Sequence, residues 1–222
     1  MTFSLLGRCE RTGMLGAVVS SSSPAVAARC IWGRAGAGVA ATQNVTDPRL
    51  GATMVNALAG GWSAADAVAS VLGEDAIEWR QIAALGADGP GFVVSGERTL
   101  GRHADVVGEA CVAAGNLLAD EGVPAAMAAA FEAAPGDHLG TRLCAALRAG
   151  LEAGGEEGPV RSSGLLVYDR VDWPVADLRV DWDDDPVGRL TELWELWQPQ
   201  ISDYVTRALD PASAPGFGVP GA

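Results

Sequence analysis

Runs of strand-like sequence alternate with pairs of helical segments along this chain of 222 residues, and that order constrains the fold most. Two strand pairs come first, followed by two helices, three strands, two helices, two strands and a last helix. A sheet must cover its apolar face with another layer, and paired helices suit the outside of a sheet. We therefore predict an α+β protein, a four-layer αββα sandwich of two packed, mostly antiparallel sheets.

The predicted strands are short apolar runs bounded by turn residues. The first two flank the polar segment 10–13, Glu-Arg-Thr-Gly, which predicts an antiparallel hairpin. The expected strands cover residues 2–7, 14–20, 31–36, 37–43, 80–86, 91–95, 109–116, 163–168 and 176–182. Glycines in the second pair favour close backbone packing rather than a phosphate-binding loop, because no helix opens at the required spacing.

The predicted helices carry their own start signals. Asp47 followed by Pro48 begins the first, Ser63 begins the second with Leu72 on its buried face, and Asp137 caps the fourth. The third covers residues 123–134. An acidic segment, Asp183-Asp184-Asp185-Pro186, begins one final helix. Its expected apolar stripe consists of Val187, Leu190, Trp194, Trp197, Ile201 and Tyr204.

No linker divides the chain, and its length suits a single core, so we predict one domain over residues 1–207. Residues 208–222 are rich in alanine, proline and glycine, and this composition predicts a disordered tail.

The excess of acidic over basic residues limits the classes of partner that the protein can bind. Fifteen basic and 28 acidic residues give a formal net charge of −13, which argues against nucleic acid or an anionic membrane as the partner. All the basic residues are arginines. The absence of lysine excludes a lysine Schiff base, a P-loop lysine and a lysine general base.

The four cysteines are widely spaced in apolar surroundings, with no CxxC pair, and predict buried free thiols. No stretch comes near the ~18 apolar residues of a membrane span. The acidic segment before the last helix is explained by the partial positive charge of a helix N-terminus, without a metal. We therefore expect a soluble cytoplasmic protein that needs neither a metal nor an organic cofactor.

The first residues, Met1-Thr2-Phe3-Ser4, place a threonine directly after the initiator. Removal of Met1 requires a small second residue and would leave Thr2 with a hydroxyl and a free α-amine, a nucleophile with its own base. The alternative is an ordinary start of a chain.

Four segments resemble the family catalogued as domain of unknown function 1028, in register from Thr2 to about Trp197. They are the opening Met-Thr-Phe-Ser, residues 34–43, residues 114–118 and residues 177–181. This family looks like a branch of the N-terminal-nucleophile (Ntn) hydrolases, which have an αββα sandwich. The resemblance implies amide hydrolysis with Thr2 as nucleophile. The chain departs from the proteasome-type members, which place a lysine beside the nucleophile.

In that mechanism the α-amine of Thr2, directly or through one water, takes the hydroxyl proton. Arg34 and Arg161 each stand beside a predicted strand end and could lower the pKa of the amine; the alternative is two surface arginines. Asn116, after Gly115 at a strand end, is the candidate oxyanion donor, with a turn asparagine as the alternative.

Four further polar residues are expected at the same end of the sandwich, where they would orient the α-amine or contact substrate. They are Ser20, Ser21, Gln43 and Ser162, with turn or capping roles as the alternative. His103, in a polar loop, and His138, in the first turn of a helix, are not expected to be catalytic.

Two functions remain open. The first is an Ntn amidohydrolase that cleaves the C–N bond of a small amide, linear or cyclic. The second is a non-enzymatic binding or assembly module of the same fold. In either case a homodimer or a higher homo-oligomer is expected.

Overall fold

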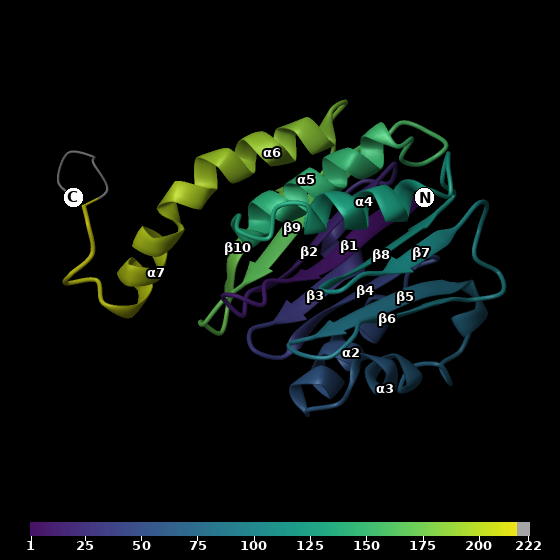
Figure 1. Ribbon diagram of the computed structural model, residues 1–222, viewed down its shortest axis with the longest axis horizontal. Helices are drawn as coiled ribbons and strands as arrows, with labels where there is room; N and C mark the ends of the chain where they lie inside the picture. The colour runs from purple at the N-terminus through teal and green to yellow at the C-terminus, as the bar shows by residue number, and fades with distance from the viewer. Residues whose placement is uncertain (217–222) are drawn as a thin grey trace.

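Two antiparallel sheets make up the centre of the protein, as the computed structural model, which describes residues 1–216, shows (Figure 1). The larger sheet has the strand order β10-β9-β2-β1-β8-β7 and the smaller one β3-β4-β5-β6. The strands are β1 (Thr2–Arg8), β2 (Leu15–Ser21), β3 (Ile31–Arg34), β4 (Gly38–Asn44), β5 (Arg80–Gly86), β6 (Phe92–Ser95), β7 (Ala104–Val107), β8 (Cys111–Asn116), β9 (Ser162–Tyr168) and β10 (Pro174–Val180).

Helices cover the outer face of each sheet (Figure 1). The smaller sheet packs against α2 (Pro48–Ala59) and α3 (Ala64–Ala69), and the larger against α4 (Val123–Glu132), α5 (Leu139–Glu152) and α6 (Pro186–Trp197). The shorter elements are α1 (Ala27–Cys30), η1 (Ile77–Trp79), η2 (Gln198–Gln200) and α7 (Ile201–Leu209). The predicted αββα sandwich is confirmed.

Side chains of β1 alternate between two of the three core layers, because successive residues of a strand face opposite sides of the sheet. Phe3 and Leu5 pack among the helices that cover the larger sheet, whereas Leu6 packs between the sheets. Thr2 and Ser4 share the face of Leu6. The start of β1 therefore directs two hydroxyls into the space between the sheets.

The predicted helix starts at Asp47 and Ser63 are confirmed by their hydrogen bonds. Asp47 accepts from the backbone N–H of Arg49 at 3.0 Å, and Ser63 accepts from Asp66 at 3.1 Å. Asp185 caps α6 by accepting from the N–H of Gly188 at 3.0 Å, so the acidic segment does serve a helix N-terminus.

Other local predictions were wrong. His138, not Asp137, caps α5, because its Nδ1 accepts from the Gly140 N–H at 3.1 Å. The short edge strand β7 was missed, since Asp105 interrupts its apolar character and only β8 pairs with it. Leu72 is 40% exposed, because α3 ends at Ala69, before it.

The last predicted helix is two helices. Pro199 lacks a backbone N–H, and the single 3-10 turn η2 separates α6 from α7 there. Helix α7 extends to Leu209, two residues into the predicted tail. Residues 217–222 of that tail lie outside the described residues.

Within residues 1–216, no helix is long and apolar enough to cross a bilayer. All four cysteines are buried free thiols. In the same range, no group of three or more His, Cys, Asp or Glu side chains is arranged to hold a metal ion.

Candidate active site at the start of β1

Four buried polar residues form a row across the larger sheet at the start of β1. In the antiparallel register Thr2 lies opposite Asn116 of β8, and Ser21 of β2 lies opposite Ser162 of β9. Thr2 is 4% exposed and the other three are fully buried. Buried polar groups need hydrogen-bond partners, so the contacts of these four residues define what the row can do.

The hydroxyl groups of Thr2 and Ser21 both bind the carbonyl oxygen of Met1. Thr2 Oγ1 and Ser21 Oγ each donate to that oxygen at 2.5 Å, and the two hydroxyls are 3.5 Å apart. The Ser23 N–H donates to Ser21 Oγ at 3.1 Å, which leaves the Ser21 proton for the carbonyl. An amide carbonyl thus already lies beside the Thr2 hydroxyl.

Beneath this row, a chain of amide side chains links the two sheets. Ser4 Oγ donates to Gln43 Oε1 at 2.7 Å, and Gln43 Nε2 donates to Gln81 Oε1 at 2.8 Å. Gln81 was missed by the sequence analysis. Its signal was a glutamine on the inward face of an otherwise apolar strand, Gln-Ile-Ala-Ala-Leu.

The same network fixes the side-chain amide of Asn116. Its Nδ2 donates to Gln81 Oε1 at 3.1 Å, and its Oδ1 has no hydrogen-bond partner among residues 1–216. The unpartnered atom is therefore an acceptor. The amide nitrogen carries two protons and gives one to Gln81, so the second remains available as the donor expected for an oxyanion. Asn116 lies beside Thr2 as expected, and its role as oxyanion donor stays a prediction.

Ser20 and Ser162 support the backbone near Thr2. Ser20 Oγ donates to the Ser162 carbonyl at 3.0 Å, from the strand face opposite to that of Ser21. Ser162 Oγ donates to the Ser23 carbonyl at 2.6 Å and accepts from the Val26 N–H at 3.1 Å. Ser162 thereby holds the loop that follows Ser21.

Neither candidate arginine directs its charge toward Thr2. Arg161 donates its backbone N–H to the Ser21 carbonyl at 2.8 Å, but its guanidinium pairs with Asp184. Arg34 is exposed and lies opposite Gly38, at the far end of β4 from Gln43. Five strand residues separate these ends by roughly 17 Å. The expectation that Arg34 belongs to the site is wrong.

Glu156, which the sequence did not indicate as a site residue, has a buried carboxylate near the N-terminus. Glu156 is 4% exposed, and burial raises its pKa to about 7, an effect partly offset by Ser22 and by the Met1 ammonium. The segment Gly-Gly-Glu-Glu-Gly after a helix looks like a solvated loop, so no sequence signal could have found it.

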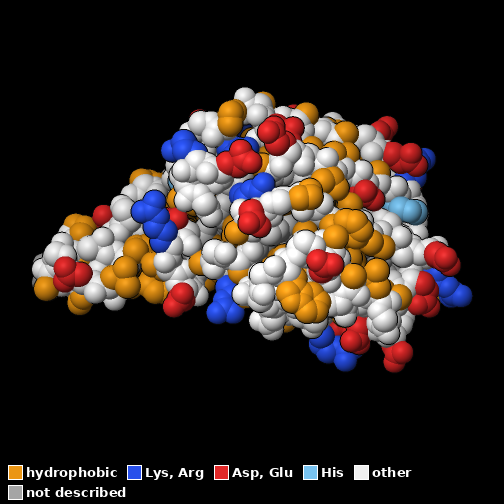
Figure 2. All heavy atoms as spheres, turned by 60° about the horizontal axis from the view of Figure 1, so that its bottom comes forward, with side chains coloured by type: hydrophobic (Ala, Val, Ile, Leu, Met, Phe, Trp, Pro, Cys, Tyr) orange, Lys and Arg blue, Asp and Glu red, His pale blue; other side chains and the backbone are white. Residues whose placement is uncertain are grey.

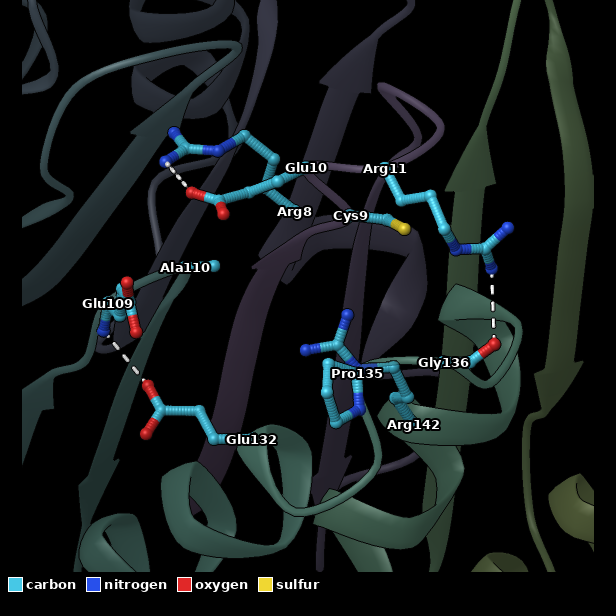
Figure 3. Close-up of a pocket in the computed structure, with 10 residues that line it drawn as sticks. All are labelled: Arg8, Cys9, Glu10, Arg11, Glu109, Ala110, Glu132, Pro135, Gly136 and Arg142. Carbon is cyan, nitrogen blue, oxygen red and sulfur yellow. Dashed lines mark hydrogen bonds and ion pairs between the residues drawn. The ribbon is translucent and has the colours of Figure 1, made fainter.

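A hollow of about 450 Å³ lies at the other end of β1, around Arg8 and Cys9 (Figure 3). Six residues separate it from Thr2, or about 20 Å along the strand. Arg8 pairs with Glu10 at 3.7 Å, and Arg11 donates to the Gly136 carbonyl at 3.1 Å. The hollow is therefore separate from the Thr2 row, and both of these arginines have partners within it.

Comparisons with known proteins identify a family but no reaction. Residues 2–190 match the model of the family of unknown function DUF1028. The crystal structure of a Silicibacter pomeroyi protein of that family is similar, with 29% sequence identity and a TM-score of 0.82, over 91% of this chain and 92% of the other. No curated protein matches the sequence.

Proposed function

We propose that this chain, which belongs to the DUF1028 family, is an N-terminal-nucleophile amidohydrolase that cleaves a small amide, linear or cyclic. One observation carries the proposal. An amide carbonyl oxygen, that of Met1, lies 2.5 Å from Thr2 Oγ1, and a second hydroxyl, that of Ser21, donates to it. A substrate carbonyl that took its place would meet a nucleophile and an electrophilic donor together.

Catalysis begins once Met1 has been removed. The free α-amine of Thr2 then takes the proton of the Thr2 hydroxyl as Oγ1 bonds to the carbonyl carbon. An unperturbed α-amine has a pKa of ~7.7–8.0, and burial favours its neutral form. Because neither Arg34 nor Arg161 directs its charge toward Thr2, desolvation takes the part in lowering the pKa of the amine that we expected of a cationic neighbour.

The carbonyl oxygen becomes an oxyanion in this step. The Ser21 hydroxyl stabilises it, and loss of one such donor typically raises a barrier by about 2.7–4 kcal/mol. Asn116 Oδ1, the unpartnered acceptor beside Thr2, accepts from the α-amine and orients its lone pair toward Oγ1. Gln81 holds Asn116 in this orientation.

The reaction is completed in two stages, acylation of Thr2 and hydrolysis of the ester. The protonated α-amine gives its proton to the leaving nitrogen as the C–N bond breaks, which leaves an ester on Thr2 Oγ1. A water molecule then attacks that ester, and its proton passes through the α-amine to Oγ1 as the C–O bond breaks. The products are a carboxylic acid and an amine, with Thr2 restored.

The proposal predicts that Met1-free protein hydrolyses amides and that Thr2→Ala abolishes this activity, because alanine keeps the α-amine but removes the nucleophile. Thr2→Ser should retain part of the activity. Mass spectrometry establishes the N-terminus, a panel of small linear and cyclic amides reports hydrolysis, and thermal melts verify folding. Thr53→Ala, which removes an exposed hydroxyl on α2 bonded only to the Arg49 carbonyl, is the matched control.

Three results would contradict the proposal: no hydrolysis by Met1-free protein, hydrolysis by protein that retains Met1, or hydrolysis by Thr2→Ala at the rate of the parent. The four buried free thiols are compatible with the reducing cytoplasm as its location.

The second candidate, an assembly module, rests on α7. This helix has no fully buried residue, and Leu209 is 65% exposed on it, as is Leu196 (66%) near the end of α6. We propose that a second copy of the chain covers this surface in a homo-oligomer. Assembly and hydrolysis are compatible, because Figure 1 places α7 and the N-terminus on opposite sides of the molecule.

A further inference from the structure

The segment that carries Glu156 runs beside the Thr2 row. Leu118 and Glu156 form an antiparallel bridge, and the Glu157 N–H donates to the Leu117 carbonyl at 2.9 Å. Leu117 directly follows Asn116, which lies opposite Thr2. Glu156 is thereby brought to the same end of the sandwich as the proposed nucleophile.

The carboxylate of Glu156 is buried, and Ser22 and the Met1 ammonium offset the cost of that burial only in part. The residue is 4% exposed, and neither carboxylate oxygen has a hydrogen bond of good geometry to any of residues 1–216. A buried carboxylate in this state is costly unless a cation or several donors meet it. A cation bound beside this carboxylate would stabilise its charged form, so the position suits a ligand with a positive charge.

Met1 lies near both Glu156 and the two hydroxyls. Its carbonyl oxygen accepts from Thr2 and Ser21, and its ammonium is close enough to lower the pKa of Glu156. Its methyl end lies 3.9 Å from where a Cβ at Gly158 would be. Met1 is itself an α-aminoacyl group, with its carbonyl beside the Thr2 hydroxyl and its ammonium near enough to act on the carboxylate.

We propose that the substrate is the amide of an α-amino acid with a free amino group, and that Glu156 binds its ammonium in the space that Met1 vacates. The inference rests on the proposed function, since it names the substrate class of the same site. An α-aminoacyl amide carries its ammonium on the carbon next to the carbonyl, as Met1 does. Position 158 is a glycine, and because glycine has no side chain, it leaves room for the side chain of the substrate's amino acid.

The test uses Met1-free protein and three p-nitroanilides that share one carbon skeleton: alanine p-nitroanilide, its N-acetyl derivative and propionyl p-nitroanilide. We expect kcat/KM for the free amine to exceed that for the other two by about tenfold or more, the ratio that ~1.4 kcal/mol of binding provides. In Glu156→Gln this ratio should fall to about one, with the change mainly in KM. Glu157→Gln, which alters the exposed next residue, should keep the ratio.

A second measurement separates binding from chemistry. Calorimetry with Met1-free Thr2→Ala should detect alaninamide but not N-acetylalaninamide, and Glu156→Gln in that background should abolish the difference. If kcat/KM for the acetylated or amine-free compound equals or exceeds that for the free amine, the inference is overturned, while the hydrolysis still supports the amidohydrolase. If no compound is hydrolysed, the amidohydrolase is contradicted. In that case equal binding of the two alaninamides overturns the inference as well.

Discussion

At the scale of single residues, Glu156 should make stability depend on pH. Its pKa of about 7 lies above the ordinary 4.5, because burial penalises the charged form. Below about pH 4.5 the side chain is protonated in both the folded and the unfolded state, and its burial then costs no charge. As the pH rises to 7 the folded state must release a proton that the unfolded state has already lost, and stability on the order of 3 kcal/mol is lost.

Glu156→Gln should therefore stabilise the protein at about pH 8, with a difference from the parent that shrinks toward pH 4.5. Thermal melts of protein with a defined N-terminus, at several pH values between these limits, measure the effect. Glu157→Gln is the control and should follow the parent at every pH, because that carboxylate is exposed. A Glu156→Gln variant less stable than its parent at about pH 8 would contradict this prediction. It would show that interactions with the charged carboxylate outweigh the cost of its burial.

At the scale of elements, the contact between α5 and α6 depends on a glycine. A Cβ at Gly140 would lie 2.7 Å from Cζ3 of Trp194 and closer to two other ring atoms. The Trp194 indole is also held by a 3.0 Å hydrogen bond from its Nε1 to Thr141 Oγ1, so it cannot easily move aside. The first turn of α5 is therefore fitted to the tryptophan of α6.

Gly140→Ala should destabilise the protein by about 1–3 kcal/mol, the usual cost of overpacking, although alanine by itself favours a helix. Urea unfolding followed by circular dichroism gives the change. Gly136→Ala is the matched control, because no atom lies within 4 Å of a Cβ built there and its effect should be near zero. A Gly140→Ala variant as stable as the parent would mean that α6 can shift away from α5.

The same elements show how far the sequence could predict the fold. Hairpins, helix caps at Asp47 and Ser63, and the order of layers are local or periodic signals, and these were confirmed. The strand register that aligns Thr2 with Asn116 is set by long-range pairing. Long-range packing also buries Glu156 and places Arg34 at the far end of β4 from Gln43. No local sequence pattern reveals either fact.

At the scale of the whole molecule, the chain has two distinct regions beyond its core. The Thr2 row lies at one end of the sandwich, and Figure 2 shows hydrophobic side chains along the arm that projects from the other side. Trp197 anchors the base of that arm, since its Nε1 donates to the Val175 carbonyl at 2.8 Å. Beyond it, Tyr204 and Leu209 are 43% and 65% exposed.

Exposed apolar groups on a projecting helix are the kind of surface that a second subunit covers. A chain that ends after Gln198 lacks α7 and should lower the assembly state, measured by light scattering, from a homo-oligomer to a monomer. A chain that ends after Asp210 keeps α7 and is the control, which should assemble like the full chain. Because α7 lies far from the N-terminus, amide hydrolysis should persist in the monomer. An unchanged mass after removal of α7 would place the subunit contact elsewhere, and a full chain that is itself monomeric would contradict assembly altogether.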